Sequence, residues 1–330
     1  MGKDKATVQD FKQFASNAER FLASGLSINS LRTNNLLRKE EWVELDTALL
    51  QVAQERLTGI EDLRARGLIH NLGGLGTLLS QWESQSDMTD AQIDMGGDTA
   101  GQEDTIEFKL HSVPVPIVHK DFRLNIRRLE ASRRLGEGLD VTQGTVAARK
   151  VAEALESMLF NGAGLTVDGN AIYGYTTHPD RNTGTATGSW ATIANIYSTV
   201  LNMIRDAQTD RMFGPYYLYT AGNVWPDLLQ VYDDGSGQTA RDRVLGIPGL
   251  EDVRVSERLE DGEAVLVQMT RDTIDLAVAQ DIVPVEWSTV GGMISHYKVM
   301  AVMVPRLKVD QGGRMGLVHY SGLRPTPDES

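Results

Sequence analysis

The sequence predicts an α+β protein in which an extended β arm and one long helix are joined to a mixed α/β domain. Three patterns support this fold class: alternating apolar residues over 105–110, apolar residues at helical spacing over 142–161, and mixed strand and helix patterns over 172–292. A long two-stranded arm that leads into a long helix suits a subunit of an assembly better than it suits a catalyst.

The arm is predicted to span residues 68–112. Ile106, Phe108 and Leu110 alternate with polar residues, which gives this strand one apolar and one polar face. Residues 77–82 can pair with residues 105–110 as a two-stranded ribbon, and glycines at 96, 97 and 101 mark its tip. Because an isolated ribbon is only marginally stable in water, we expect other subunits to hold the arm.

The long helix is predicted over residues 142–161. Its apolar stripe recurs at helical spacing and consists of Ala147, Val151, Leu155, Met158 and Leu159. Asp140 or Thr142 can cap the start of the helix, and Gly162 can end it.

Residues 1–67 are predicted to form an N-terminal arm with two amphipathic helices. One apolar stripe runs from Val8 to Leu22, and a longer one runs from Trp42 to Leu63 and ends before Gly67. Such stripes need an apolar partner, which is either the core of the same chain or an adjacent subunit.

Residues 172–292 are predicted to form a second domain of α/β type. Its strands are expected at 216–219, 253–255, 265–269 and 274–279, its helices at 193–204 and 224–231, and a surface loop of small residues at 183–189. A buried strand at 297–307 then returns the chain to the first domain, which comprises residues 113–171 and 293–330.

The composition excludes several classes of protein. The 330 residues are enough for two domains, and the net charge of -13 argues against a protein that binds nucleic acid by neutralising phosphates. No apolar run reaches the roughly 18 residues of a membrane span, and we expect no secretory signal. The absence of cysteine excludes disulfides and thiolate metal sites.

Charge is distributed unevenly along the chain. Residues 67–108 contain no Lys or Arg and eight acidic residues, whereas residues 117–135 are rich in Lys and Arg. Each run is either a solvated face or half of a contact in which the acidic arm of one subunit lies on the basic region of its neighbour. The candidate interface residues are Trp82, Glu83, Glu103, Asp104 and Glu107 in the arm, and Lys120, Arg123, Arg127, Arg128 and Arg134 in the basic region.

Motifs for catalysis and cofactor binding are absent from the sequence. There is no GxxxxGKS/T loop, and the glycines at 162, 164 and 169 have the wrong spacing for GxGxxG. The six histidines form no HExxH motif, and no GxSxG elbow occurs. We therefore expect no catalytic residue, no cofactor and no metal site. An α/β enzyme would require a convergent polar site that the sequence does not contain.

The order of these elements resembles that of the HK97-fold major capsid proteins of tailed bacteriophages and of their cellular relatives, the encapsulins. The matching features, over residues 35–320, are the arm, the helix that ends in Phe160-Asn161-Gly162, the segment at 213–219 and the closing strand at 297–304. The resemblance implies an N-terminal arm (1–67), an extended loop (68–112), a peripheral domain (113–171 and 293–330) with a spine helix (142–161), and an axial domain (172–292).

Some proteins of this family cross-link their subunits through a lysine of the extended loop and an asparagine of a neighbour. Lys109, the only lysine between Lys39 and Lys120, lies at the base of the arm, and no residue matches the asparagine, so we expect no cross-link.

The resemblance implies a major capsid protein whose hexamers and pentamers form an icosahedral shell around the double-stranded DNA of a tailed phage. Such a shell assembles in the cytoplasm of the bacterial host and becomes the capsid of the virion. The expected partners are further copies of the chain together with portal, scaffold and decoration proteins; DNA is enclosed without sequence-specific binding, and no membrane takes part. The alternative is an encapsulin, whose shell encloses cargo enzymes. The long N-terminal arm and the long acidic loop favour the phage protein.

Overall fold

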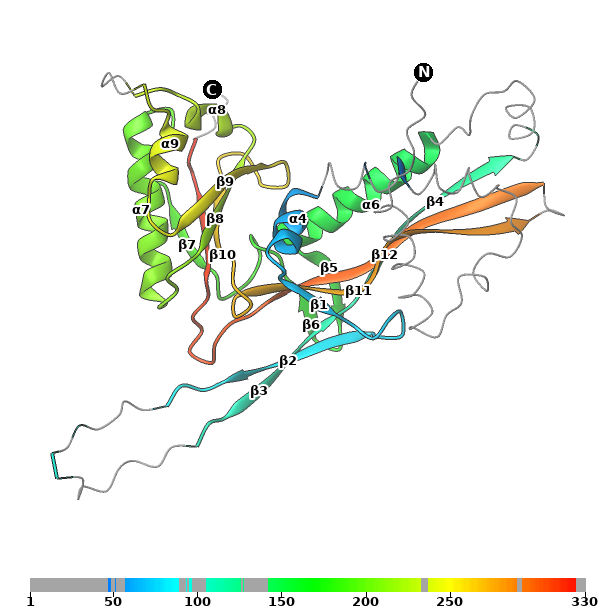
Figure 1. The fold of residues 1–330 in the computed structure, drawn as a ribbon, viewed down its shortest axis with the longest axis horizontal. Helices are drawn as coiled ribbons and strands as arrows, with labels where there is room; N and C mark the ends of the chain where they lie inside the picture. Colours follow the sequence, from blue (N-terminus) through cyan, green and yellow to red (C-terminus); the bar gives the residue numbers. More distant parts are fainter. Residues whose placement is uncertain are drawn as a thin grey trace, which may run out of the picture.

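The computed structural model describes residues 47–48, 51, 57–88, 93, 95–96, 105–125, 127, 142–232, 237–289 and 293–324. Within these residues, two larger β-sheets share one hydrophobic core, and a narrow β ribbon extends away from them (Figure 1). The α+β fold class expected from the sequence is confirmed.

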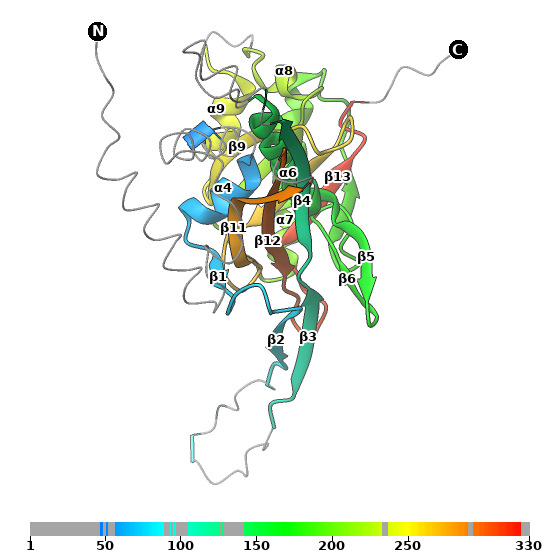
Figure 2. The ribbon, with the colours of Figure 1, turned by 90° about the vertical axis from the view of Figure 1, so that its right-hand side faces the viewer.

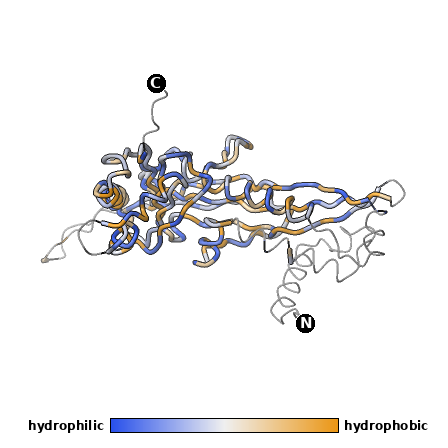
Figure 3. Tube along the Cα trace, turned by 90° about the horizontal axis from the view of Figure 1, so that it is seen from above, coloured by the Kyte–Doolittle hydropathy of each residue, from blue (hydrophilic) through white to orange (hydrophobic). Residues whose placement is uncertain are grey.

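The longer sheet has the strand order β1-β11-β12-β4, with bounds β1 Ile69–Asn71, β4 Ile117–Asn125, β11 Ile274–Thr289 and β12 Ile294–Leu307. β11 and β12 form a long antiparallel hairpin, which β4 extends along residues 294–302 of β12. The register of the hairpin shifts twice between Val278 and Val283, and such bulges increase the local twist of a sheet. Burial alternates along residues 294–298 of β12, where one face packs on the core, whereas residues 299–304 are apolar and buried throughout. Figure 3 shows hydrophilic and hydrophobic residues intermixed along the long strands.

The spine helix α6 (Thr142–Asn161) lies along this sheet (Figures 1 and 2), and its bounds are those that the sequence predicts. All five residues of the predicted apolar stripe are buried. Gly162 has φ +74°, its N–H donates to the carbonyl oxygen of Met158 at 3.0 Å, and a Cβ there would lie 2.5 Å from the carbonyl oxygen of Ile172. Glycine therefore ends the helix because the position needs both a left-handed backbone and the space of a missing side chain.

The second sheet has the strand order β7-β13-β10-β8-β9, with bounds β7 Asn182–Thr185, β8 Tyr216–Ala221, β9 Leu250–Ser256, β10 Ala264–Gln268 and β13 Leu317–Ser321. Helices α7 (Ile193–Thr209), α8 (Trp225–Leu228) and α9 (Ala240–Leu245) lie beside this sheet (Figure 1). A short hairpin of β5 (Ala163–Val167) and β6 (Asn170–Ile172) follows the spine helix. The helix expected at 224–231 is shorter than predicted: α8 ends at Leu228, and Val231 forms an isolated bridge with Thr239 instead.

The arm is a ribbon of β2 (Leu79–Gln85) and β3 (Phe108–Pro114), which projects from the body of the molecule (Figures 1 and 2). The predicted pairing of two strands is confirmed, with both strands a few residues later than expected. Trp82 pairs with His111 and their rings stack, a cross-strand contact that favours this register.

Two strands pair differently from the sequence interpretation. That interpretation assigns residues 274–289 to the axial domain and residues 317–321 to the peripheral domain. In the structure β11 pairs with β12 in the longer sheet, and β13 pairs with β10 in the second sheet. Periodicity identifies a buried strand without identifying its partner, because pairing joins residues that are distant in sequence. The segment 183–189, expected as a loop, contains the edge strand β7, which pairs with β13.

Most of the predicted N-terminal arm, including its first predicted helix, lies outside the described residues. The end of the second predicted helix is α4 (Thr58–Ala65), which stops before Gly67 at φ +68°. Its apolar residues Ile60 and Leu63 are buried in the core of the same chain, so this part of the second stripe is covered within the subunit.

Candidate assembly surfaces

The inner face of the arm rests on the body of its own subunit. The rings of Trp82 and His111 stack with centroids 5.7 Å apart, and Oγ of Ser84 lies 2.9 Å from Nε2 of His111. The guanidinium of Arg306 lies 5.7 Å from the centroid of the Trp82 ring. Burial, together with the nearby charge of Lys109, lowers the pKa of His111, so this imidazole is neutral at pH 7.

The outer face of the arm is apolar and acidic. Phe108 and Leu110 alternate along β3 and are 64% and 59% exposed, and Glu83 pairs with Leu110 across the ribbon. Residues directly opposite each other on paired strands share a face, so the carboxylate lies beside these two side chains. Large exposed apolar side chains on a projecting ribbon are typical of a surface that another protein covers.

Arg306 fixes the root of the arm. Its guanidinium makes two hydrogen bonds of 2.6 Å to the carboxylate of Asp275 and donates to Oγ of Ser80 at 3.2 Å. Lys308 also reaches Asp275, with Nζ 2.8 Å from Oδ2. Burial alone would raise the pKa of Asp275, but the hydrogen bonds from Arg306 and Lys308 outweigh it and hold this pKa below its ordinary value. The ionised pair therefore links β11, β12 and β2.

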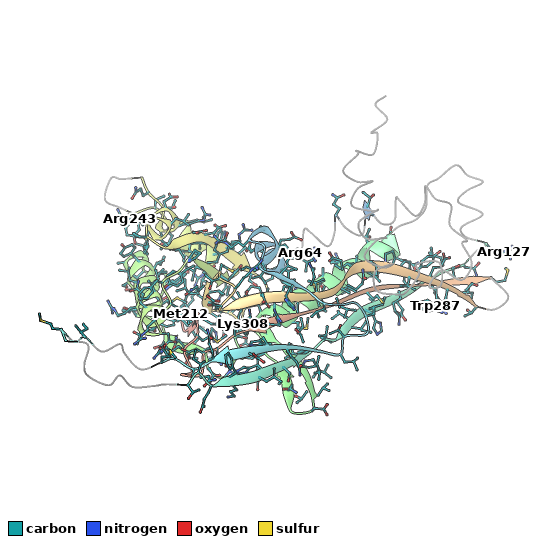
Figure 4. The ribbon with its side chains drawn as sticks, turned by 60° about the horizontal axis from the view of Figure 1, so that its bottom comes forward. Arg64, Arg127, Met212, Arg243, Trp287 and Lys308 are labelled. Atoms are coloured by element: carbon teal, nitrogen blue, oxygen red, sulfur yellow. The ribbon has the colours of Figure 1, made fainter. Side chains whose placement is uncertain are left out.

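The far end of the longer sheet carries a second, partly exposed surface. Arg123 of β4 lies opposite His296 of β12, and His296 lies opposite Trp287 of β11, which places the three side chains on one face. The rings of Trp287 and His296 stack at 5.4 Å, and Nζ of Lys298 lies 5.9 Å from the Trp287 centroid and 3.7 Å from Oδ1 of Asp121. Figure 4 shows Trp287 and Arg127 at this end of the molecule. We call Asp121, Arg123, Trp287, His296 and Lys298 the peripheral patch.

Six of the ten predicted interface residues lie in the described part of the chain, and Glu103, Asp104, Arg128 and Arg134 lie outside it. Glu83 and Glu107 are exposed on the arm, Arg123 is in the peripheral patch, and Arg127 is exposed just beyond β4. Trp82 contacts its own subunit, and Lys120 lies on the opposite face of β4 from Arg123, because residues three apart on a strand point to opposite faces. The sequence interpretation missed Trp287, His296 and Lys298 as surface residues, although the alternation of residues 285–289 and 294–298 could have indicated them.

A buried carboxyl joins the spine helix to α4. Glu156 is 4% exposed; its Oε1 accepts a hydrogen bond from the Gly59 N–H at 2.6 Å, and its Oε2 accepts one from the Ile60 N–H at 3.4 Å. Burial raises the pKa of Glu156 to about 7, although the two N–H groups at the start of α4 favour the charged form. The carboxyl is therefore poised between its two protonation states near neutral pH.

Asp62 joins the same helix to the second sheet. Its Oδ2 accepts a hydrogen bond from the Tyr219 hydroxyl at 2.8 Å, and its Oδ1 lies 3.1 Å from the guanidinium of Arg254. Burial raises the pKa of Asp62 in spite of these partners. The helix α4 is thus held by polar contacts to both α6 and the second sheet.

The described residues contain no group of three or more His, Asp or Glu side chains that could hold a metal ion. Among the helices that the structure describes, none is long and apolar enough to cross a membrane.

Comparison with known proteins identifies relatives in sequence. The model of the family Linocin_M18, the encapsulating protein for peroxidase, matches residues 29–289. The type 1 encapsulin shell protein EncA of Myxococcus xanthus is 27% identical over 281 residues, which cover 83% of this chain and 91% of EncA. The diheme-cytochrome-encapsulin shell fusion protein of Kuenenia stuttgartiensis is 24% identical over 277 residues, which cover 83% of this chain and 72% of that protein.

Solved structures share the fold. A virus-like particle from Pyrococcus furiosus matches with a TM-score of 0.63 at 18% identity, over 86% of this chain and 99% of that chain. The capsid of the Myoviridae phage XM1 matches with a TM-score of 0.62 at 13% identity, over 80% of this chain and 92% of that chain. The HK97-like capsid fold predicted from the order of elements is confirmed.

The family match, over residues 29–289, spans most of the chain. It also confirms the prediction of a structural protein instead of an enzyme. The chain belongs to the family of encapsulating proteins for peroxidase and is a shell-forming protein of the HK97 fold.

Proposed function

We propose that this chain is the shell subunit of an encapsulin-type compartment that encloses protein cargo. The observation that carries the proposal is the family match over residues 29–289, together with the relative EncA, which is named as an encapsulin shell protein. The fold does not separate the two interpretations of the sequence, because the virus-like particle and the phage capsid have nearly equal TM-scores of 0.63 and 0.62. The tailed-phage interpretation, with its packaged DNA and its portal, scaffold and decoration proteins, is supported by the fold alone.

Assembly is proposed to depend on the outer face of the arm. The carboxylate of Glu83 is complementary in charge to Arg123 and Lys298 of the peripheral patch on a neighbouring subunit. Covering Phe108, which is 64% exposed, with the ring of Trp287 in the patch would contribute part of the about 1.5–3 kcal/mol that full burial of such a side chain gives. A contact of this size is modest by itself, but a closed symmetric shell repeats it in every subunit.

The identity of the cargo tests the proposed function directly. Particles purified from the native source would be imaged by electron cryo-microscopy, their proteins identified by mass spectrometry, and their nuclease-protected nucleic acid measured. Closed shells that contain a co-purified enzyme and little protected nucleic acid are the expected result. Particles that protect genome-length double-stranded DNA and carry a portal protein would contradict the proposal and favour the phage interpretation.

A charge-swap cycle tests the proposed contact between the arm and the peripheral patch. Arg123→Glu should lower the fraction of chain found in shells at low salt, and Glu83→Lys in the same chain should partly restore it, because the pair of charges is reversed together. Mass photometry measures the fraction assembled, and circular dichroism checks that the subunit stays folded. Shells that persist in both single variants at low and moderate salt would mean that the acidic run is only a solvated face.

A further inference from the structure

The connection between β12 and β13 contacts both strands of the arm. Nε2 of Gln311 donates to the carbonyl oxygen of Ser84 at 3.2 Å and to that of Glu107 at 2.8 Å. Ser84 belongs to β2 and Glu107 directly precedes β3, and the Ser86 N–H donates to the same Glu107 oxygen at 2.9 Å. A side-chain amide has two N–H donors, so one residue can hold both strands at the end of the paired ribbon.

The connection that carries Gln311 is itself fixed to the axial domain. Oδ1 of Asp310 accepts a hydrogen bond from the Arg314 N–H at 2.8 Å, and Gly313 turns the chain with φ +75°. The Met315 N–H donates to Oδ2 of Asp210, the residue that follows α7, at 3.1 Å. Lys308 is the first residue after β12, and Figure 4 shows it beside the base of the arm. Gln311 therefore reaches the arm from a loop that is already ordered by its own contacts.

Ion pairs between the arm and the rest of the subunit are weaker candidates for holding the two strands of the arm in place. Oδ2 of Asp87 lies 3.6 Å from Nη1 of Arg211 and 3.8 Å from Nη1 of Arg314. The Asp87 side chain is 74% exposed and that of Arg211 is 68% exposed, and such exposed pairs contribute little in water. The hydrogen bonds of Gln311 are shorter and join uncharged groups, so salt does not screen them.

We infer that Gln311 is a positioning residue that sets the direction of the arm before a neighbouring subunit binds it. Arg306 holds the arm at Ser80, and Gln311 holds it at Ser84. Four residues of a β-strand span about 13 Å, so the two fixed points define a direction in space. An arm that already points toward its docking site loses less conformational freedom on assembly. This inference rests on the proposed function, in which the arm joins subunits of a shell.

Spin labels can measure the direction of the arm, because the chain has no cysteine of its own. Cysteines would replace Gln85 on the arm and Gln208 on α7, two exposed positions, and the labelled chain would be diluted with unlabelled chain so that distances within one subunit dominate. Pulsed electron paramagnetic resonance gives the distribution of the label distance. Gln311→Glu keeps the shape of the side chain but presents a carboxylate to two carbonyl oxygens. Gln143→Glu, at an exposed position in the first turn of the spine helix, is the matched control.

A narrow distribution is expected for the parent chain and for Gln143→Glu, and a broader or shifted one for Gln311→Glu with an unchanged melting temperature. Gln311→Lys, which retains donors, should restore part of the narrow distribution. If Gln311→Glu unfolds the subunit, Gln311→Met, which removes the donors without adding charge, provides the same readout. If the folded Gln311 variant gave a distribution of label distances as narrow as that of the parent chain, the inference would be overturned. Because the distance lies within one subunit, a chain that forms no shell would refute the proposed function without affecting this measurement.

Discussion

Replacing Glu156 by Gln should remove a pH dependence from the stability of the subunit. Burial between α6 and α4 raises the pKa of this carboxyl from 4.5 to about 7. Between these two values the folded state holds a proton that the unfolded chain has lost. The contribution to the free energy of unfolding is therefore fully present below pH 4.5 and is lost as the pH rises through 7.

The two pKa values set the size of the effect. A difference between 4.5 and about 7 corresponds to about 3 kcal/mol, at about 1.4 kcal/mol for each pH unit. Above the isoelectric point of about 4.9, between pH 5.5 and 8.5, about 2 kcal/mol of this should be observable. The amide that replaces the carboxyl in Glu156→Gln would keep an acceptor for the Gly59 N–H but not for the Ile60 N–H, which costs about 1–3 kcal/mol at every pH. The variant should thus be clearly less stable at pH 5.5 and should approach or exceed the parent chain at pH 8.5.

Urea denaturation of subunits dissociated from shells, followed by tryptophan fluorescence at fixed protein concentration, gives the free energy of unfolding at each pH. Asp62 titrates in both proteins and largely cancels in the difference between them. Glu153→Gln on the same helix is the control: the hydrogen bond from Lys150 lowers the pKa of Glu153, so its contribution has the opposite sign. Unfolding free energies of the parent chain and Glu156→Gln that stay parallel from pH 5.5 to 8.5 would refute the reasoning.

Four further substitutions test how the fold is held together. Leu155→Ala opens a cavity under the fully buried stripe of the spine helix and should lower the free energy of unfolding by about 2–5 kcal/mol in urea melts. Asp275→Leu leaves the buried guanidinium of Arg306 without a carboxylate and should cost about 3–5 kcal/mol, whereas Arg306→Met leaves Asp275 paired with Lys308 and should cost less in the same melts; equal losses would contradict this ranking. Gly162→Ala places a residue with a Cβ at φ +74°, a left-handed conformation that should cost about 1–3 kcal/mol of stability. The expected result is faster proteolysis near the end of α6.

Local patterns explain what the sequence could predict. The spine helix depends on residues within one segment, namely an apolar stripe that includes Leu155 and a glycine at 162, and its bounds agree with the structure. The prediction of the arm also depends on local patterns, since its two strands alternate and flank a segment that is rich in glycine. Its register, by contrast, depends on the stacking of Trp82 on His111, which no pattern along one strand indicates.

Contacts between distant segments explain what the sequence could not predict. The peripheral patch joins β4 to a hairpin more than 160 residues later, so Arg123 was expected at a surface but Trp287 and His296 were not. Lys120 was grouped with Arg123 by charge alone, and strand alternation separates them. Gln311 is a single polar residue in a connection, and only the folded chain brings its amide to the two strands of the arm.

The polar contacts of the subunit differ in how strongly the solvent can weaken them. The pair of Asp275 and Arg306 is buried and makes two short charge-assisted hydrogen bonds. Salt in the solvent therefore screens this ion pair only weakly. Glu83 and Arg123, proposed to meet across subunits, are exposed, and an exposed ion pair contributes only about 0–1 kcal/mol and is weakened by salt. Interactions that hold the arm to its own subunit therefore outlast those that hold it to a neighbour. It follows that a shell of this design can lose its contacts between subunits while each subunit keeps its fold and the direction of its arm, which is the condition for assembling again.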